Sequence, residues 1–232
     1  MAELNPAFVI QSIKNVSFED REVPKLRDEY DVRVHVEQTG ICGSDLHCWQ
    51  RGRISDFVLE SPIVLGHESS GTVFEVGDKV KNVKKYYVVD CDYTYPIPGH
   101  MSAEDGALVE PIAVAVQICK VAGLRGGQTV LVFGCGPIGV LCQAVAKPYG
   151  AGRVNVVFPI TAACIAVLNI KGSIRYTTGC YPEAVSPVAS GKVQLRRLIT
   201  HPYKFQEALE AFEVVRQAKE DTLKVVIQGV PK

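Results

Sequence analysis

The strongest constraint on the fold is a run of apolar and β-branched residues that leads directly into a glycine-rich turn. Residues 129–133 read Thr-Val-Leu-Val-Phe, and the turn Gly-Cys-Gly-Pro-Ile-Gly follows at 134–139. A continuous β-branched run is typical of a strand buried on both faces of a parallel sheet. The apolar residues at 140–146 predict a helix after the turn. A strand, a glycine turn and a helix in this order predict a nucleotide-binding parallel sheet.

The spacing of the glycines predicts a dinucleotide site at this turn. Glycines permit the tight turn and let the backbone approach a pyrophosphate, which then lies at the N-terminus of the helix. A plain strand–helix turn that happens to contain glycines is the alternative. The expected cofactor contacts are Gly134, Gly136, Pro137, Ile138 and Gly139.

The first 90 residues predict a different kind of sheet. Residues 8–10, 16–18, 32–36 and 71–77 form short β-branched or alternating runs that Gly, Pro, Asn and Asp separate. Such runs predict a compact, mostly antiparallel barrel or sandwich. With the parallel sheet downstream, the sequence predicts a mixed α/β fold.

Further elements follow from local patterns. Ser102 with two acidic residues behind it predicts a helix start, which the pair Glu110-Pro111 should interrupt before the helix resumes at residue 112. Apolar spacing predicts an amphipathic helix at 205–218, and residues 168–176 and 223–227 predict strands.

The composition excludes several classes of partner. Apolar residues make up 47% and charged residues 22%, which is ordinary for a globular protein. Lys+Arg and Asp+Glu number 25 each, so no net field favours nucleic acid or an anionic membrane. The N-terminal residues lack the pattern of a secretory signal, and no apolar run reaches the ~20 residues of a membrane span. We therefore expect a cytoplasmic protein, without membrane or nucleic-acid partners.

Two short segments carry the candidate metal ligands. Residues 40–49 read Gly-Ile-Cys-Gly-Ser-Asp-Leu-His-Cys-Trp, and residues 65–68 read Leu-Gly-His-Glu. Cys42, His67 and Glu68 supply a thiolate, an imidazole and a carboxylate, which are ligands that zinc accepts. A site with three protein ligands leaves a position for water or substrate, as catalytic zinc sites do. Buried thiol and surface polar groups are the alternative reading.

These segments resemble the zinc-dependent medium-chain dehydrogenases. Trp49 and the following Arg-Gly-Arg-Ile resemble the polyol branch, with fungal-type xylitol dehydrogenase (D-xylulose reductase) most similar and sorbitol dehydrogenase close to it. The resemblance implies a GroES-like catalytic domain, a Rossmann-type domain (truncated here by the second of the gaps described below), NAD and one catalytic Zn²⁺.

The resemblance also assigns roles residue by residue. It implies that Cys42, His67 and Glu68 bind the metal, that Asp45 orients a ligand imidazole, and that Glu110 binds the metal's water or the substrate. It further implies a proton path through Ser44 and His47, cofactor contacts at Ser173, Ile174 and Arg175, and polyol contacts at Cys48, Glu110, Arg175 and Tyr176. Cys48 departs from the family, because relatives usually carry tyrosine there.

Two gaps interrupt the resemblance. After Lys84 a strand and the cysteine-rich lobe that often holds a structural zinc are missing, so no second zinc is expected. After Val157, Phe158 and Pro159 stand where an acid would bind the ribose, and further strands and helices are missing. The predicted domains are 1–115 (GroES-like), 116–174 (truncated Rossmann) and 175–232 (return to the catalytic domain).

Two hypotheses therefore remain. The first is a zinc-dependent, NAD-linked oxidoreductase of a polyol, most simply xylitol and D-xylulose, impaired by truncation. The second is an inactive zinc-binding remnant that serves as an interaction module or is an imperfect gene product. Missing central strands should expose apolar edges at 130–133 and 154–157, which predicts poor solubility. The resemblance leaves a homo-oligomer open.

Overall fold

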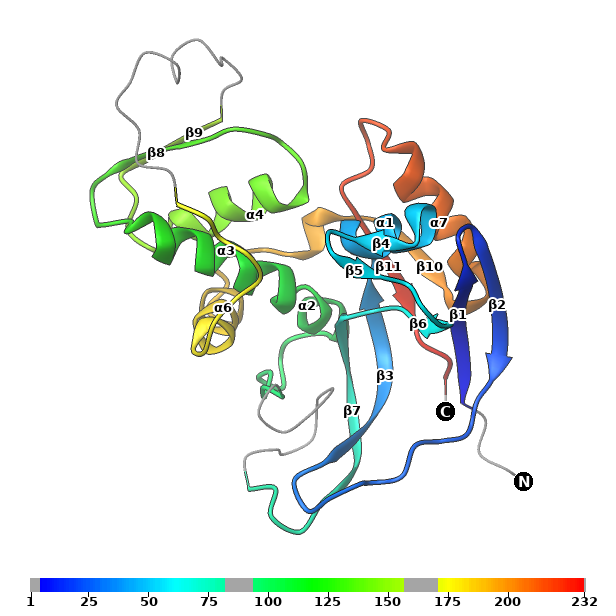
Figure 1. Ribbon diagram of the computed structural model, residues 1–232. Helices are drawn as coiled ribbons and strands as arrows, with labels where there is room; N and C mark the ends of the chain where they lie inside the picture. The colour runs from blue at the N-terminus through cyan, green and yellow to red at the C-terminus, as the bar shows by residue number, and fades with distance from the viewer. Residues whose placement is uncertain (1–4, 82–93, 157–170, 232) are drawn as a thin grey trace. The chain divides into compact units, whose positions relative to one another are not determined.

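The computed structural model describes residues 5–81, 94–156 and 171–231. The chain divides into two compact units, one made of residues 1–107 with 199–232 and the other of residues 108–198. The chain thus leaves the first unit and returns to it near its end. The mixed α/β class is confirmed (Figure 1). The three domains predicted with boundaries after residues 115 and 174 stay a prediction.

A three-stranded antiparallel sheet forms one part of the first unit. It consists of β1 (Pro6–Ser12), β2 (Asn15–Asp20) and β6 (Ile63–Val64), in the order β2-β1-β6. Residues 7–10 of β1 are buried, and they carry the apolar side chains that the sequence places in this strand.

A four-stranded sheet forms the other part. It consists of β3 (Val32–Gly40), β7 (Glu68–Val76), β10 (Ile199–Lys204) and β11 (Lys224–Gln228), in the order β10-β11-β3-β7. Its pairs are antiparallel except β10 with β11, which are parallel. The mostly antiparallel architecture agrees with the prediction. The position of β3 matters for the site, because β3 lies between β11 and β7 and pairs with both.

Two helices close the core of the first unit. These are α1 (Gly43–Arg51) and α7 (Ala208–Gln217), which follows a 3₁₀ turn, η3 (Phe205–Glu207). The ring of Trp49 packs edge-on against Phe212 with centroids 5.9 Å apart. The amphipathic helix predicted at 205–218 is confirmed. The buried core cluster is Phe8, Ile10, Ile41, Trp49, Ala208, Ala211, Phe212 and Val225.

Smaller elements complete the first unit. A short hairpin of β4 (Arg53–Ile54) and β5 (Phe57–Val58) follows α1. Helix α2 (Ala103–Ala107) begins as predicted, since Ser102 Oγ accepts the Asp105 N–H at 3.1 Å and the Asp105 carboxylate accepts the Ser102 N–H at 3.2 Å. This reciprocal capping satisfies two backbone donors that would otherwise lack partners.

The predicted interruption at Glu110-Pro111 is wrong. The break falls at Leu108, and α3 (Val109–Ala122) begins before both residues. Proline is tolerated in a first turn because a backbone N–H there has no intrahelical acceptor to lose.

In the part of the second unit that the structure describes, there is one βαβ segment. Strand β8 (Thr129–Val132) leads into α4 (Pro137–Ala146), and β9 (Arg153–Val156) pairs with β8 in parallel. Within the described residues this sheet has two strands. Helices α3 and α4 pack on each other, and so do α3 and α6 (Cys180–Ala189); a 3₁₀ turn, η2 (Arg196–Leu198), ends the unit.

Burial of β8 on both faces is a wrong prediction. Its residues alternate between exposed and half-buried, and Leu131 and Phe133 are 45% and 50% exposed. A strand needs neighbours on each side and layers on both faces to be buried, and the described residues provide only β9 beside it. The exposed apolar side chains agree with the expectation for a sheet that lacks central strands.

The strand predicted at 168–176 is only partly described. Residues 171–176 form no strand, and Arg175 adopts a positive φ of 51°, which a regular strand excludes. Residues 168–170, and the ribose position at Phe158 and Pro159, lie outside the described residues.

One carboxylate joins the helices of the second unit. Glu183 on α6 forms an ion pair with Lys120 on α3 at 2.5 Å. It also accepts a hydrogen bond from the hydroxyl of Tyr149, a residue just after α4. The Lys120 ammonium, and then the Tyr149 hydroxyl, lower the pKa of Glu183. None of the helices in the described ranges combines the length and apolarity needed to cross a bilayer.

Candidate metal centre and nucleotide site

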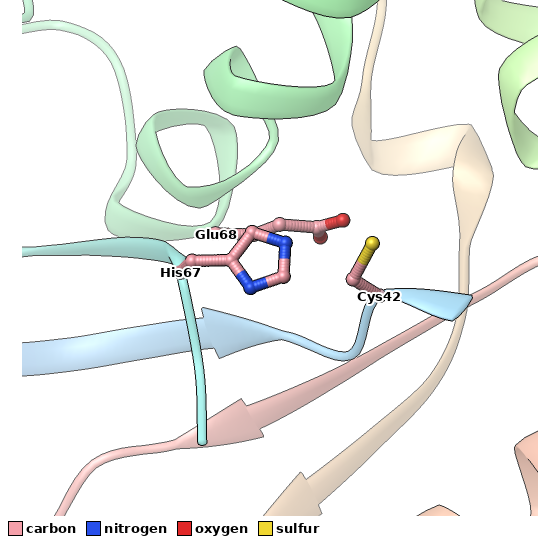
Figure 2. Close-up of side chains that lie close together, drawn as sticks. All are labelled: Cys42, His67 and Glu68. Carbon is pink, nitrogen blue, oxygen red and sulfur yellow. The ribbon is translucent and has the colours of Figure 1, made fainter. Parts of the chain in front are cut away.

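Three predicted metal ligands converge in the first unit. One ligand atom each from Cys42, His67 and Glu68 lies within 4.8 Å of the other two. Figure 2 shows the sulfur, the imidazole ring and the carboxylate facing a common space. A thiolate, an imidazole and a carboxylate at this separation fit a zinc ion with a position left for water or substrate.

Strand register brings these residues together. Gly40 ends β3 and lies opposite Glu68, the first residue of β7, so Cys42 and His67 emerge next to each other. The turn before His67 requires glycine, because Gly66 has a φ of 117° and a Cβ there would lie 2.8 Å from the Thr39 methyl group. The sequence spacing alone does not reveal this pairing.

Asp45 links two of the ligands. Its carboxylate accepts a hydrogen bond from the Cys42 N–H at 3.1 Å, and its other oxygen lies 3.3 Å from His67 Nδ1. Asp45 is 3% exposed. The second ring nitrogen of His67 therefore points toward Cys42 and Glu68 (Figure 2). The orienting contact expected of Asp45 is present.

The same contacts change the proton affinity of the imidazole. The Asp45 carboxylate, with a smaller contribution from Cys42, raises the pKa of His67 from 6.5 to about 11, and burial opposes this only in part. A metal ion must displace a proton from a ligating imidazole, so metal and proton compete here.

The remaining candidates on α1 differ in exposure. Ser44 is half-buried and His47 is exposed, as a proton path to solvent would need. Cys48 is fully buried, and burial followed by the Asp45 charge raises the pKa of its thiol.

The glycine turn in the second unit has the geometry that its sequence predicts. Gly134 has a φ of 111°, and a Cβ on Gly139 would lie 2.2 Å from the Gly134 carbonyl oxygen. Gly136 caps α4, with Pro137 in its first turn, and has open space around its Cα. A cleft of about 950 Å³ runs along this turn, β8 and α3, and it is lined mainly by apolar side chains, Ile138 included. A dinucleotide phosphate could approach the N-terminus of α4 here.

The other predicted site residues of the second unit come from two separate segments of the chain. Glu110 is buried in the first turn of α3. Ser173, Ile174 and Arg175 are exposed, whereas Tyr176 is half-buried and packs edge-on against Tyr181.

One functional candidate escaped the sequence reasoning. Lys224 on β11 is buried and forms an ion pair with Glu68. The only signal was a lysine inside an otherwise apolar closing strand, which by itself does not name a partner.

Comparison with known proteins places the chain in a family. Residues 28–186 match the family model described as the alcohol dehydrogenase GroES-like domain. D-xylulose reductase A from Aspergillus niger is 33% identical, with 97% of each chain covered. The chain belongs to the medium-chain alcohol dehydrogenase family, in its polyol branch. The alignment spans 349 positions although this chain has 232 residues, so the relative contains segments that this chain lacks.

Solved structures agree on the fold. An Escherichia coli oxidoreductase of unknown specificity, ECK1772, superimposes with a TM-score of 0.86 at 21% identity, covering 99% of this chain and all of that chain. Galactitol-1-phosphate dehydrogenase from Escherichia coli gives 0.79 at 18% identity, with 97% and 100% covered.

Proposed function

We propose that this chain is a zinc-dependent, NAD-linked oxidoreductase that interconverts a polyol with its ketose. The convergence of Cys42, His67 and Glu68 on one small space carries the proposal. Relatives named D-xylulose reductase support xylitol and D-xylulose as the substrate pair. A cytoplasmic location, a single zinc and a homo-oligomer stay predictions from the sequence.

The donor set defines the chemistry at the metal position. Zinc held there would polarise the substrate oxygen and lower the pKa of the alcohol. Asp45 keeps the His67 ring turned toward Cys42 and Glu68. We assign the transfer of the alcohol proton to solvent to Ser44 and His47. Glu110 is assigned the binding of water or of a substrate hydroxyl.

The cofactor and the polyol are assigned to other residues. The turn with Gly134, Gly136 and Gly139 would hold the pyrophosphate of NAD, with Pro137 and Ile138 beside it. The other assignments follow the family resemblance: Ser173, Ile174 and Arg175 contact the cofactor, and Cys48, Arg175 and Tyr176 contact the polyol.

A second candidate function is an inactive zinc-binding module. The two-stranded β8–β9 sheet with exposed Leu131 favours it, because a complete dinucleotide fold needs more parallel strands. The metal ligands belong to the first unit, so metal binding should be retained better than NAD binding.

One set of measurements on three purified proteins tests both candidates. Zinc content and xylitol-dependent NADH formation are measured on wild type, on Cys42→Ser and on Cys180→Ser. Cys180→Ser is the control, because the native Cys180 sulfur contacts Gln117 in the second unit. We expect Cys42→Ser to lose zinc and Cys180→Ser to keep it. Zinc with turnover supports the oxidoreductase, and zinc without turnover supports the module. Tight NADH binding without zinc contradicts both.

A further inference from the structure

Glu68 contacts a buried cation that lies two strands away. Gly40 on β3 pairs with Glu68 on β7 and, on its other side, with Val226 on β11. Lys224 stands two residues before Val226, so its side chain leaves the sheet on the same face. The Lys224 ammonium and the Glu68 carboxylate meet as an ion pair above β3.

Gly40 makes this contact possible. A Cβ at position 40 would lie 2.2 Å from Glu68 Oε2 and 3.1 Å from Lys224 Cε. Any side chain there would occupy the space in which the two charged groups meet. Gly40 has no left-handed backbone angle, so the requirement is for space and not for conformation.

The Lys224–Glu68 pair is shielded from water and is also hydrogen-bonded to the backbone next to Cys42. Glu68 is 2% exposed and Lys224 is 6% exposed. Lys224 Nζ also donates a hydrogen bond to the Ile41 carbonyl oxygen at 3.2 Å, directly before Cys42. A buried carboxylate and ammonium need each other, since either one alone would be an uncompensated buried charge.

The charge of Lys224 also acts on the metal position. Cys42 as thiolate and Glu68 as carboxylate supply two negative charges, which together would balance the 2+ charge of a zinc ion. Lys224 adds a positive charge beside Glu68 and takes up one of its oxygens. Like charges in a buried site repel strongly because little water screens them.

We propose that Lys224 is a positioning residue that holds Glu68 through the space above Gly40, weakens zinc binding and keeps the bound metal strongly electrophilic. This inference rests on the proposed zinc-dependent function. It predicts a result opposite in sign to that of a purely structural lysine, whose removal would loosen the site and speed the loss of metal.

The test compares wild type with Lys224→Met, which removes the charge at similar length, and with Lys224→Arg, which keeps it. Each protein is prepared with zinc, and the rate of zinc release to a chromophoric chelator is measured. We expect release from Lys224→Met to be slower by about tenfold or more, within the roughly 10–100-fold range by which outer residues change metal affinity. Lys224→Arg should stay within about threefold of wild type by the same reasoning.

Cobalt substitution gives a second readout. Replacing zinc with Co²⁺ should give Lys224→Met a visible spectrum different from that of wild type, because both oxygens of Glu68 become available to the metal. The Lys224→Arg spectrum should resemble that of wild type.

The outcomes separate the two proposals. Failure of wild type to hold zinc more tightly than Cys42→Ser overturns the proposed function. If wild type binds zinc but Lys224→Met releases it as fast as wild type or faster, only the role of Lys224 is overturned. Zinc should compensate Glu68 when the lysine is gone, so inability to obtain folded, zinc-loaded Lys224→Met also overturns it.

Discussion

Asp45 Oδ1 lies 3.3 Å from Nδ1 of His67, while the second oxygen of the same carboxylate accepts the backbone N–H of Cys42 at 3.1 Å. One buried group thus fixes the ring of one ligand and the backbone of another. We expect Asp45→Asn to weaken zinc binding about 10–100-fold, because the ligand imidazole loses its charged partner.

Competition with a chelator measures this loss, and Asp56→Asn is the control. Asp56 is exposed on the same unit, so its substitution should leave zinc affinity unchanged. Equal affinity in Asp45→Asn and wild type would show that the contact does not support the metal ligands.

Gly139 and Gly136 should respond differently to alanine. A Cβ at Gly139 meets a backbone carbonyl at 2.2 Å, whereas Gly136 has open space. Gly139→Ala should therefore lower the free energy of unfolding by about 1–3 kcal/mol. Gly136→Ala should leave stability unchanged and weaken NADH binding, because the methyl group obstructs the approach to the helix N-terminus.

Urea unfolding measures the stability of these two variants, and NADH fluorescence measures binding. Gly139→Ala with wild-type stability would mean that the close approach between the Gly134 carbonyl and the start of α4 is relaxed in solution.

Lowering the pH should weaken the second unit through Glu183. Lys120 and Tyr149 hold its pKa below 4.5, so its contribution to stability is present above pH 4.5 and is lost as the pH falls through the lowered pKa. The carboxylate is 44% exposed, so solvent screening limits the effect to roughly 1 kcal/mol or less.

Melting curves between pH 6 and pH 3 (roughly the range in which carboxylates titrate) check this. Glu183→Gln should be less stable than wild type at pH 6 and should lose less stability on acidification. Parallel curves for the two proteins would exclude a role for this carboxylate.

The exposed face of β8 should promote association between molecules. Leu131→Lys places a charge on an exposed apolar strand and should delay aggregation, which light scattering during heating would detect. Ile174→Lys is the matched control, because Ile174 is 84% exposed and lies outside the strands. An equal delay in both variants would argue against a specific role for β8.

The sequence predicted much of this molecule for identifiable reasons. Alternating and β-branched runs located strands β1, β2, β3, β7 and β11 of the first unit but not β10 or the two-residue strands, and the two motif segments located Cys42, His67 and Glu68. Local patterns fail where long-range context decides. Burial of β8 was predicted from its composition, but burial depends on neighbouring strands, and the described residues supply only β9.

The role of Lys224 was hidden for a related reason. Its contact with Glu68 depends on the register of three strands and on the missing side chain at Gly40. None of these can be deduced from the residues around position 224 alone. The helix break at Leu108 was not predicted, because a proline marks a helix boundary but does not determine whether the helix begins before or after the proline.

The long sequence separation between Lys224 and the metal ligands has a consequence for biosynthesis. Lys224 is 183 positions after Ile41, so the ribosome must add the entire second unit before this cation can reach Glu68. The nascent first unit therefore emerges with its acidic ligand uncompensated. If the lysine weakens metal binding, the growing chain binds zinc most tightly before β11 is synthesised, and the arrival of β11 then weakens the hold on an ion that is already bound.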